Sequence, residues 1–286
     1  MSTLRQIKKR IRSIESTRKI ARAMELVSVN KLRKVEDRAH AMRPYVGRMD
    51  EILKNVVAAA EDFHHPLLDE RREKKALALC VLTSDSGLCG SYNNNILRLA
   101  DGFVRQQPAE TKIHIVAVGK KGFSHFRGRG FALSRSFIGL NGRYQENVAD
   151  EITRYLQEQF LTRTVDEVHV AYTRFETNAR HCATVEKFLN ISLPGARVRS
   201  ENFIWEPSRG EIFAEVMAEF LILKLRSYLL QSFVCEHSSR IIAMSMAKEN
   251  AKELLENLIL QQNKLRQALI TKDVSEIVGA AEALKG

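Results

Sequence analysis

The chain has 286 residues, of which 44% are hydrophobic and 28% charged, with a formal net charge of +11. This length holds one or two domains of roughly 150 residues each. No stretch approaches the ~20 consecutive apolar residues of a membrane-spanning helix, so the sequence contains no such segment. The positive charge gathers in residues 1–50, which carry 14 Lys/Arg against 5 Asp/Glu, whereas residues 236–286 carry 7 of each. Such a block favours nucleic acid, a membrane surface or an acidic protein as a partner.

Residues 1–60 predict one long helix. Ile7, Ile11 and Ile14 step by four and three, which places them on one face. The same rhythm continues through a thinner, more polar stretch and then an apolar one: Arg18, Ala21, Glu25, Ser28, Leu32, Val35 and Ala39. Pro44 is expected to kink the helix or to end it nearby, with a helical pattern resuming afterwards.

Residues 75–205 predict a small α/β domain. Apolar, strand-like runs alternate with helical spacing in the order strand 75–85, helix 93–106, strand 112–119, helix 145–160 and strand 165–175. Strands that alternate with helices are typical of a mostly parallel, Rossmann-like sheet.

Residues 209–286 predict a second long helix, because they contain no proline and no glycine between Gly210 and Gly279. Seventy helical residues would extend roughly 100 Å at about 1.5 Å per residue, more than one globular domain needs. The predicted fold class is therefore α/β with long helices. An antiparallel coiled coil of residues 1–60 and 209–286 flanks the small Rossmann-like domain.

The stretch "DSGLCGSYNN" follows the first predicted strand and puts Cys89 between two glycines. A phosphate-binding loop of the GxxxxGK[ST] kind needs a lysine that this stretch lacks. A cysteine nucleophile needs a neighbouring cation, and the local chain offers Asp85 and Ser86 instead. Gly87 and Gly90 are most simply explained by a tight connection into the next helix, with Ser91 or an asparagine at 93–95 as the N-cap. A ligand or partner contact and a catalytic cysteine are the alternatives.

Four other features have a structural and a functional interpretation. His64 and His65 lack a third metal ligand in register, so a charged connector is favoured over a metal site. The basic segment 120–130 could contact phosphates, although a solvated turn beside a helix is favoured. Trp205 is expected to be a packing anchor. The four cysteines show no CxxC pair and are expected to be reduced thiols, and no cofactor is expected.

Three stretches together resemble the gamma subunit of F-type ATP synthases, the rotor shaft of the catalytic head. They are "LRQIKKRIRSIESTRKIARAMELVSVNKLRK", "TSDSGLCGSYN" and "NKLRQALITKDVSEIVGAAEAL", which occur in the family's order and at its separations. The resemblance implies a non-catalytic protein, present in one copy per complex, that turns within three alpha and three beta subunits. It also implies that the α/β foot binds the epsilon subunit and the membrane c-ring, with no nucleic acid and no small-molecule substrate.

The same resemblance implies a set of contacts with the alpha and beta subunits. Basic side chains would face acidic beta segments, and Met24 would lie beside one of them. Arg266 and Gln267 would bind beta-subunit loops, and an apolar tip would sit in the collar of the head. The complete set is Lys8, Lys9, Arg10, Arg12, Met24, Arg33, Lys34, Gly87, Cys89, Arg266, Gln267, Ile277, Val278 and Leu284.

The chain departs from the family's pattern at Lys248 and Glu249, where Thr and Asp are usual, and at Gln262 and Ser91, where Tyr and Gly are usual. These departures indicate a divergent member, placed by the resemblance as a peripheral protein on the cytoplasmic face of a bacterial inner membrane. The alternative from charge alone is a basic coiled-coil nucleic-acid-binding protein, which the lack of interleaved aromatic residues disfavours. A thiol-dependent hydrolase built on the Cys89 turn is a third hypothesis.

Overall fold

The computed structural model describes residues 3–58, 66–68, 71, 74–177, 180–191 and 209–283. The chain divides into two compact units. Unit 1 comprises Met1–Val27 and Ile241–Gly286, and unit 2 comprises Ser28–Arg240. Two long helices, α1 (Leu4–Ala58) and α5 (Arg209–Ala283), contribute to both units. The predicted helices are confirmed, and α1 continues through Pro44 as a single element.

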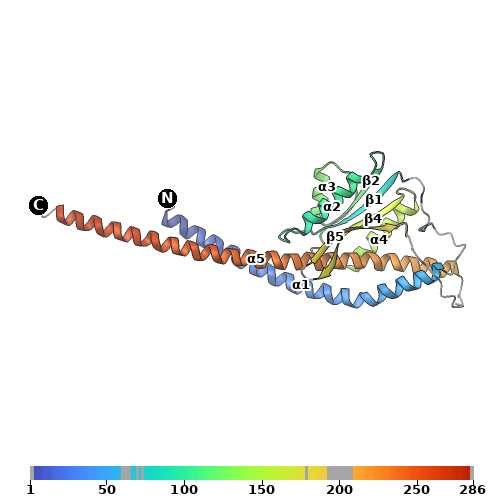
Figure 1. The fold of residues 1–286 in the computed structure, drawn as a ribbon, viewed down its shortest axis with the longest axis horizontal. Coiled ribbons are helices and arrows are strands. Elements are labelled where there is room, and N and C mark those ends of the chain that lie inside the picture. Colours follow the sequence, from blue (N-terminus) through green and yellow to red (C-terminus); the bar gives the residue numbers. More distant parts are fainter. Residues whose placement is uncertain are drawn as a thin grey trace. The chain divides into compact units, whose positions relative to one another are not determined.

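Unit 2 is built on a five-stranded sheet (Figure 1). Its spatial order is β3-β2-β1-β4-β5, with the bounds β1 Ala76–Leu82, β2 Lys112–Val118, β3 Leu133–Phe137, β4 Glu167–Thr177 and β5 Arg180–Leu189. The first four strands pair in parallel, and β5 pairs antiparallel with β4. Three shorter helices connect the strands: α2 (Tyr92–Gln106), α3 (Lys120–Gly128) and α4 (Glu146–Leu161).

Both faces of the sheet are covered, which explains why β1 is apolar at almost every position. Leu77, Leu79 and Val81 pack on one face with residues of α2 and α3. Ala78, Cys80 and Leu82 pack on the other face with residues of α4 and α5. The middle of α5 is therefore part of the core of unit 2, which accounts for its apolar character on most sides.

The apolar stripe predicted on α1 is its buried face. Ile7, Ala21, Ser28 and Val35 are only 2%, 4%, 2% and 4% exposed. Within unit 1 a hydrogen bond joins Glu25 of α1 to Lys248 of α5, residues that lie 223 positions apart. The antiparallel pairing of the terminal helices in unit 1 and the α/β sheet of unit 2 confirm the predicted fold class.

Three elements were not predicted from the sequence, namely α3, β3 and β5. The segment 120–130 was expected to be a turn beside a helix, and this expectation was wrong because residues 120–128 form α3. The sheet also has an antiparallel edge strand, β5, beyond the three strands that the apolar runs indicated.

Candidate functional site

The glycine–cysteine turn between β1 and α2 is folded around Cys89. The Cys89 side chain is 1% exposed, and Asn93 Nδ2 donates to its Sγ at 3.1 Å. Asn93 Oδ1 in turn accepts from the backbone N–H of Ser84 at 3.0 Å. Burial raises the pKa of the Cys89 thiol, which disfavours the thiolate that a nucleophile needs. The turn is therefore a closed structural unit rather than a nucleophile site.

The glycines of the turn have different roles. Gly90 has a φ of 56°, as expected for a tight connection. Gly87 has no positive φ, and a Cβ there would meet only the end of the Lys121 side chain at 3.8 Å. The second left-handed position is instead Leu88, with a φ of 62° and a side chain 58% exposed. The helix begins after Ser91 as predicted, although Ser91 makes no side-chain cap hydrogen bond.

Asp85 ties this turn to the loop between β3 and α4. Its Oδ1 accepts from the backbone N–H of Lys120 at 2.9 Å and of Gly139 at 3.1 Å. Its Oδ2 accepts from the N–H of Asn141 at 2.6 Å. One carboxylate thus fixes the start of α3 and the 139–141 backbone beside the turn. Sequence reasoning noted Asp85 only as a poor partner for a cysteine.

A group of buried charged residues on α5 lies against the same turn and loop. Glu236, His237 and Arg240 are 1%, 0% and 5% exposed. Burial raises the pKa of Glu236, against the attraction of Arg240, and lowers the pKa of His237 to about 4. Sequence reasoning missed all three. The sequence does contain a feature that could have revealed them, because three ionisable residues lie within five positions of a helical stretch that is apolar on either side.

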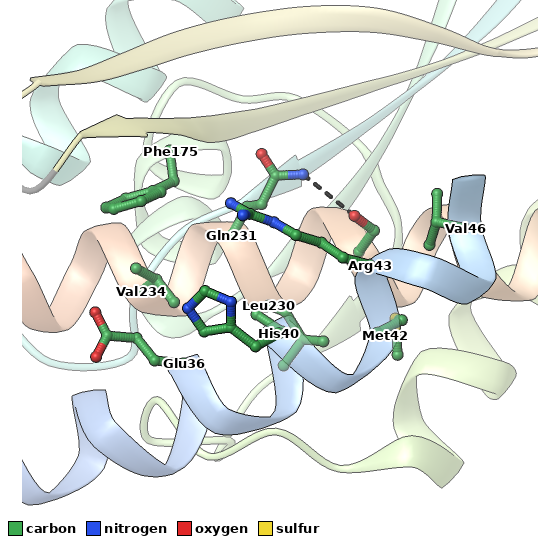
Figure 2. Close-up of a pocket in the computed structure, with 11 residues that line it drawn as sticks. Glu36, His40, Met42, Arg43, Val46, Phe175, Leu230, Gln231 and Val234 are labelled. Carbon is green, nitrogen blue, oxygen red and sulfur yellow. Dashed lines mark hydrogen bonds between the residues drawn. The ribbon is translucent and has the colours of Figure 1, made fainter.

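A groove of about 460 Å³ in unit 2 lies between α1 and α5, beside the end of β4 (Figure 2). Met42, Leu230, Val234 and Phe175 supply apolar lining, and the polar residues are Glu36, His40, Arg43, Ser227 and Gln231. The Ser227 hydroxyl accepts a hydrogen bond from Gln231 Nε2 at 3.2 Å, drawn as the dashed line in Figure 2. Both residues of that bond belong to α5 and lie four positions apart.

The basic residues assigned to partner contacts are exposed, but they belong to different units. Lys8, Lys9, Arg10 and Arg12 lie in unit 1, whereas Arg33 and Lys34 lie in unit 2. Met24 is half-buried on α1 in unit 1. The single basic block of the sequence is thus divided between two structural units.

The C-terminal candidates lie on the last turns of α5. Arg266 and Gln267 are exposed. Ile277 and Val278 are 68% and 56% exposed and lie close in sequence to the exposed apolar residues Leu269, Ile270 and Val274. The remaining candidates, Leu284 at the tip and His64, His65 and Trp205 elsewhere, lie outside the described residues.

The basic segment 120–130 uses part of its charge within unit 2. Arg129 pairs with Asp101, and His125 Nε2 lies 3.0 Å from the same carboxylate. The four cysteines are free thiols. Across the part of the chain that the structure describes, no three His, Cys, Asp or Glu side chains gather as a metal site, and none of the helices is apolar enough over a sufficient length to cross a membrane.

Comparison with known proteins identifies the family. A protein-family profile described as ATP synthase matches residues 3–284. The ATP synthase gamma chain of Chlorobium phaeobacteroides is 37% identical over 294 residues, and that of Moorella thermoacetica is 36% identical over 285, each with 100% of both chains covered.

Solved structures show the same fold. A chain of the mitochondrial ATP synthase of Euglena gracilis (OSCP/F1/c-ring) matches with a TM-score of 0.69 at 16% identity, covering 98% of this chain and 94% of that one. A chain of the Tetrahymena thermophila mitochondrial ATP synthase central stalk and c-ring matches at 0.60 and 22% identity, covering 80% and 99%. With relatives matched over its whole length, the chain belongs to the ATP synthase gamma-chain family, the non-catalytic central-stalk subunits of F-type ATP synthases.

Proposed function

We propose that this rotor subunit divides its work between its helices and its α/β domain. The paired helices, residues 1–60 with 209–286, form the shaft inside a ring of three alpha and three beta subunits. The domain at 75–205 forms the foot, which binds the epsilon subunit and the membrane c-ring. One copy of the chain serves each complex. The 37% sequence identity to a gamma chain over the full length of both chains supports this assignment.

The observation that carries the proposal is the exposed apolar end of α5. Leu269, Ile270 and Val274 are 44%, 54% and 54% exposed, and Ile277 and Val278 more so. Large apolar side chains exposed together on one segment mark a surface that another protein covers. We infer that the collar of the alpha–beta ring covers this tip, with Leu284 included, and that Arg266 and Gln267 bind beta-subunit loops just before it.

The exposed basic residues of α1 fit a contact that must work at several rotor angles. Lys8, Lys9, Arg10 and Arg12 present flexible cations, as do Arg33 and Lys34 farther along. Charge attraction is long-ranged and depends weakly on orientation, unlike a close-packed apolar interface. We infer that these residues face acidic segments of the beta subunits and favour rotation rather than one fixed angle.

We place the chain on the cytoplasmic face of a bacterial inner membrane, held there through its complex. The curated relatives at 36–37% identity are bacterial gamma chains, which supports this location. Family membership also favours the rotor over the nucleic-acid-binding alternative that charge alone allowed.

The test is purification of the complex at native expression level through an affinity tag on this chain. We expect alpha, beta and this chain in a three-to-three-to-one ratio, together with the epsilon and c subunits. Recovery of nucleic acid without an ATPase head would overturn the proposal, especially if binding to DNA falls steeply with added salt.

A further inference from the structure

The turn at 84–90 has a partner that the family comparison does not assign, the guanidinium of Arg240 on α5. Arg240 Nη2 donates to the carbonyl oxygen of Ser86 at 3.2 Å and to the Ser86 hydroxyl at 3.1 Å. Arg240 Nε donates to the carbonyl oxygen of Gly87 at 3.3 Å. The glycine–cysteine turn thus presents a cluster of oxygen acceptors to a single arginine.

The Arg240 guanidinium is buried next to a buried carboxylate. Arg240 is 5% exposed, and its Nη2 lies 2.8 Å from Oε1 of Glu236, which is 1% exposed. Neither carboxylate oxygen of Glu236 meets hydrogen-bond geometry with any side chain or backbone group that the structure describes. The carboxylate therefore supplies charge, and the turn supplies the directed hydrogen bonds. A buried guanidinium needs both.

The neighbouring loop holds α5 and α1 in the same way. His237 Nε2 lies 2.8 Å from the carbonyl oxygen of Gly142, and Lys31 Nζ of α1 donates to the carbonyl oxygen of Asn141 at 2.7 Å. Gly142 has a φ of 66°, and a Cβ there would approach His237 Cε1 to 2.5 Å. Because Asp85 bonds the backbone of this loop to the turn, both long helices are joined to one polar assembly.

We propose that Lys31, Asp85, Glu236, His237 and Arg240 form a clamp, buried on its α5 side, that transmits torque between the long helices and the sheet domain. The clamp lies within unit 2, whose last residue is Arg240. Charge-assisted hydrogen bonds to backbone carbonyls have a preferred direction, so they resist twisting of α1 and α5 against the sheet. Apolar packing is non-directional and resists such twisting less. In this proposal the glycine–cysteine turn supplies the oxygen acceptors that bind Arg240.

This inference rests on the proposed rotor function, and the experiment uses the whole complex in vesicles. Arg240→Met keeps the aliphatic stem but removes the charge and the donors. Glu236→Gln with Arg240→Met removes the orphaned carboxylate charge as well. Arg154→Met is the matched control, since Arg154 is exposed on α4 and, among the described residues, donates to the Asp150 carbonyl oxygen of its own helix.

Two quantities are measured, namely amide exchange at residues 84–90 and ions pumped per ATP hydrolysed. For Arg240→Met we expect about tenfold faster exchange in the turn and a pumping ratio lower by about half or more, with ATP hydrolysis by the head within about twofold of wild type. The double variant should keep the low ratio, because it lacks the same directed hydrogen bonds, and the control should match wild type. An unchanged ratio in assembled Arg240→Met complex would overturn the clamp.

If Arg240→Met fails to assemble, Arg240→Lys decides. The ammonium of lysine keeps the charge, but it cannot bond to the two backbone carbonyl oxygens with the geometry of the branched guanidinium. We therefore expect a ratio of ions pumped to ATP hydrolysed between those of wild type and Arg240→Met. A wild-type ratio, or a failure of both variants to assemble, would mean that Arg240 serves folding and would overturn the proposal. Absence of ATP-driven pumping in the wild-type complex would instead refute the rotor function itself.

Discussion

Lys248 Nζ lies 2.7 Å from Oε2 of Glu25, joining α5 to α1 within unit 1. The two side chains are 34% and 20% exposed, so the pair is more shielded than a typical surface ion pair. From the sequence resemblance, Lys248 is expected to stand where the family usually has threonine. Its contact with Glu25 joins the two antiparallel helices at this position.

Glu25→Gln should therefore destabilise the chain by about 1 kcal/mol, the upper end for an ion pair with partial solvent screening. The matched control is Glu249→Gln, because Glu249 pairs with Lys252 at 3.2 Å while both side chains are more than half exposed. That change should cost less than about 0.5 kcal/mol. Chemical unfolding of the purified chain measures both. Equal losses would show that the interhelical pair stabilises the chain no more than the exposed pair on α5 does.

The long helices and the strands β1, β2 and β4 could be predicted because their signals are local. The 3-4 stripe on α1 marks its buried face, and the apolar run 76–82 reflects a strand covered on both sides. β3 and β5 were missed for the opposite reason. They are the two edge strands of the sheet, and "LSRSF" and "RHCATVEKFL" carry polar residues that a half-covered edge tolerates.

The clamp could not be predicted, since its members come from three separate parts of the chain. Lys31, Asp85 and residues 236–240 are brought together only by the tertiary fold. From the sequence, each of these residues would be interpreted on its own as a solvated charge or a turn residue. The sequence did predict that Cys89 would lie in a turn, but the cation that approaches this turn, Arg240, lies about 150 residues away in sequence.

His237 should make stability depend on pH. Its Nδ1 lies 3.3 Å from Arg240 Nη1, which favours the neutral imidazole, and its Nε2 faces the Gly142 carbonyl oxygen, which places the hydrogen of that neutral ring on Nε2. Burial lowers the pKa of His237 from 6.5 to about 4. The unfolded chain therefore binds more protons between these values. The contribution is fully present above pH 6.5 and is lost as the pH falls toward 4.

The His237→Gln variant isolates this effect, because protonation of neighbouring Glu236, whose pKa is raised, acts in the opposite direction in both proteins. Between about pH 7.5 and about pH 5, the stability advantage of wild type over the variant should shrink by about 2 kcal/mol. Unfolding by denaturant at the two pH values measures it. A difference that stays constant would mean that His237 keeps its ordinary pKa.

Gly142→Ala should destabilise unit 2 more than the same change at Gly130. Both glycines have positive φ, 66° and 79°, so both alanines pay backbone strain of about 1 kcal/mol. Only at Gly142 would the new Cβ also meet His237, and Gly130 has nothing within 4 Å. Overpacking should add about 1–3 kcal/mol at Gly142 alone, visible as a lower thermal midpoint. Matching midpoints would show that the loop moves aside at little cost.

Cys89→Ala should leave ATP hydrolysis by the assembled complex within about twofold of wild type, because the thiol is buried and held protonated. A hydrolysis rate lower by more than about a hundredfold, with assembly intact, corresponds to an activation barrier higher by roughly 2.7 kcal/mol. Such a result would mean that Cys89 has a functional role. Cys182→Ala is the control, since Cys182 is a half-buried free thiol on β5.

Met24→Lys should lower the coupling between rotation and catalysis. Met24 is half-buried on α1, next to Glu25, and the family resemblance places it beside an acidic beta-subunit segment. A lysine there would add an ion pair of about 1 kcal/mol when partly buried, against about 0–1 kcal/mol when exposed. This attraction deepens the energy well of one rotor angle without helping the next. The ratio of ions pumped to ATP hydrolysed should therefore fall more than assembly or ATP binding does.

Met24→Leu keeps the apolar contact and should retain the wild-type ratio. A fully assembled Met24→Lys complex with an unchanged ratio would mean that Met24 is not at this contact, or that the shaft transmits no torque there.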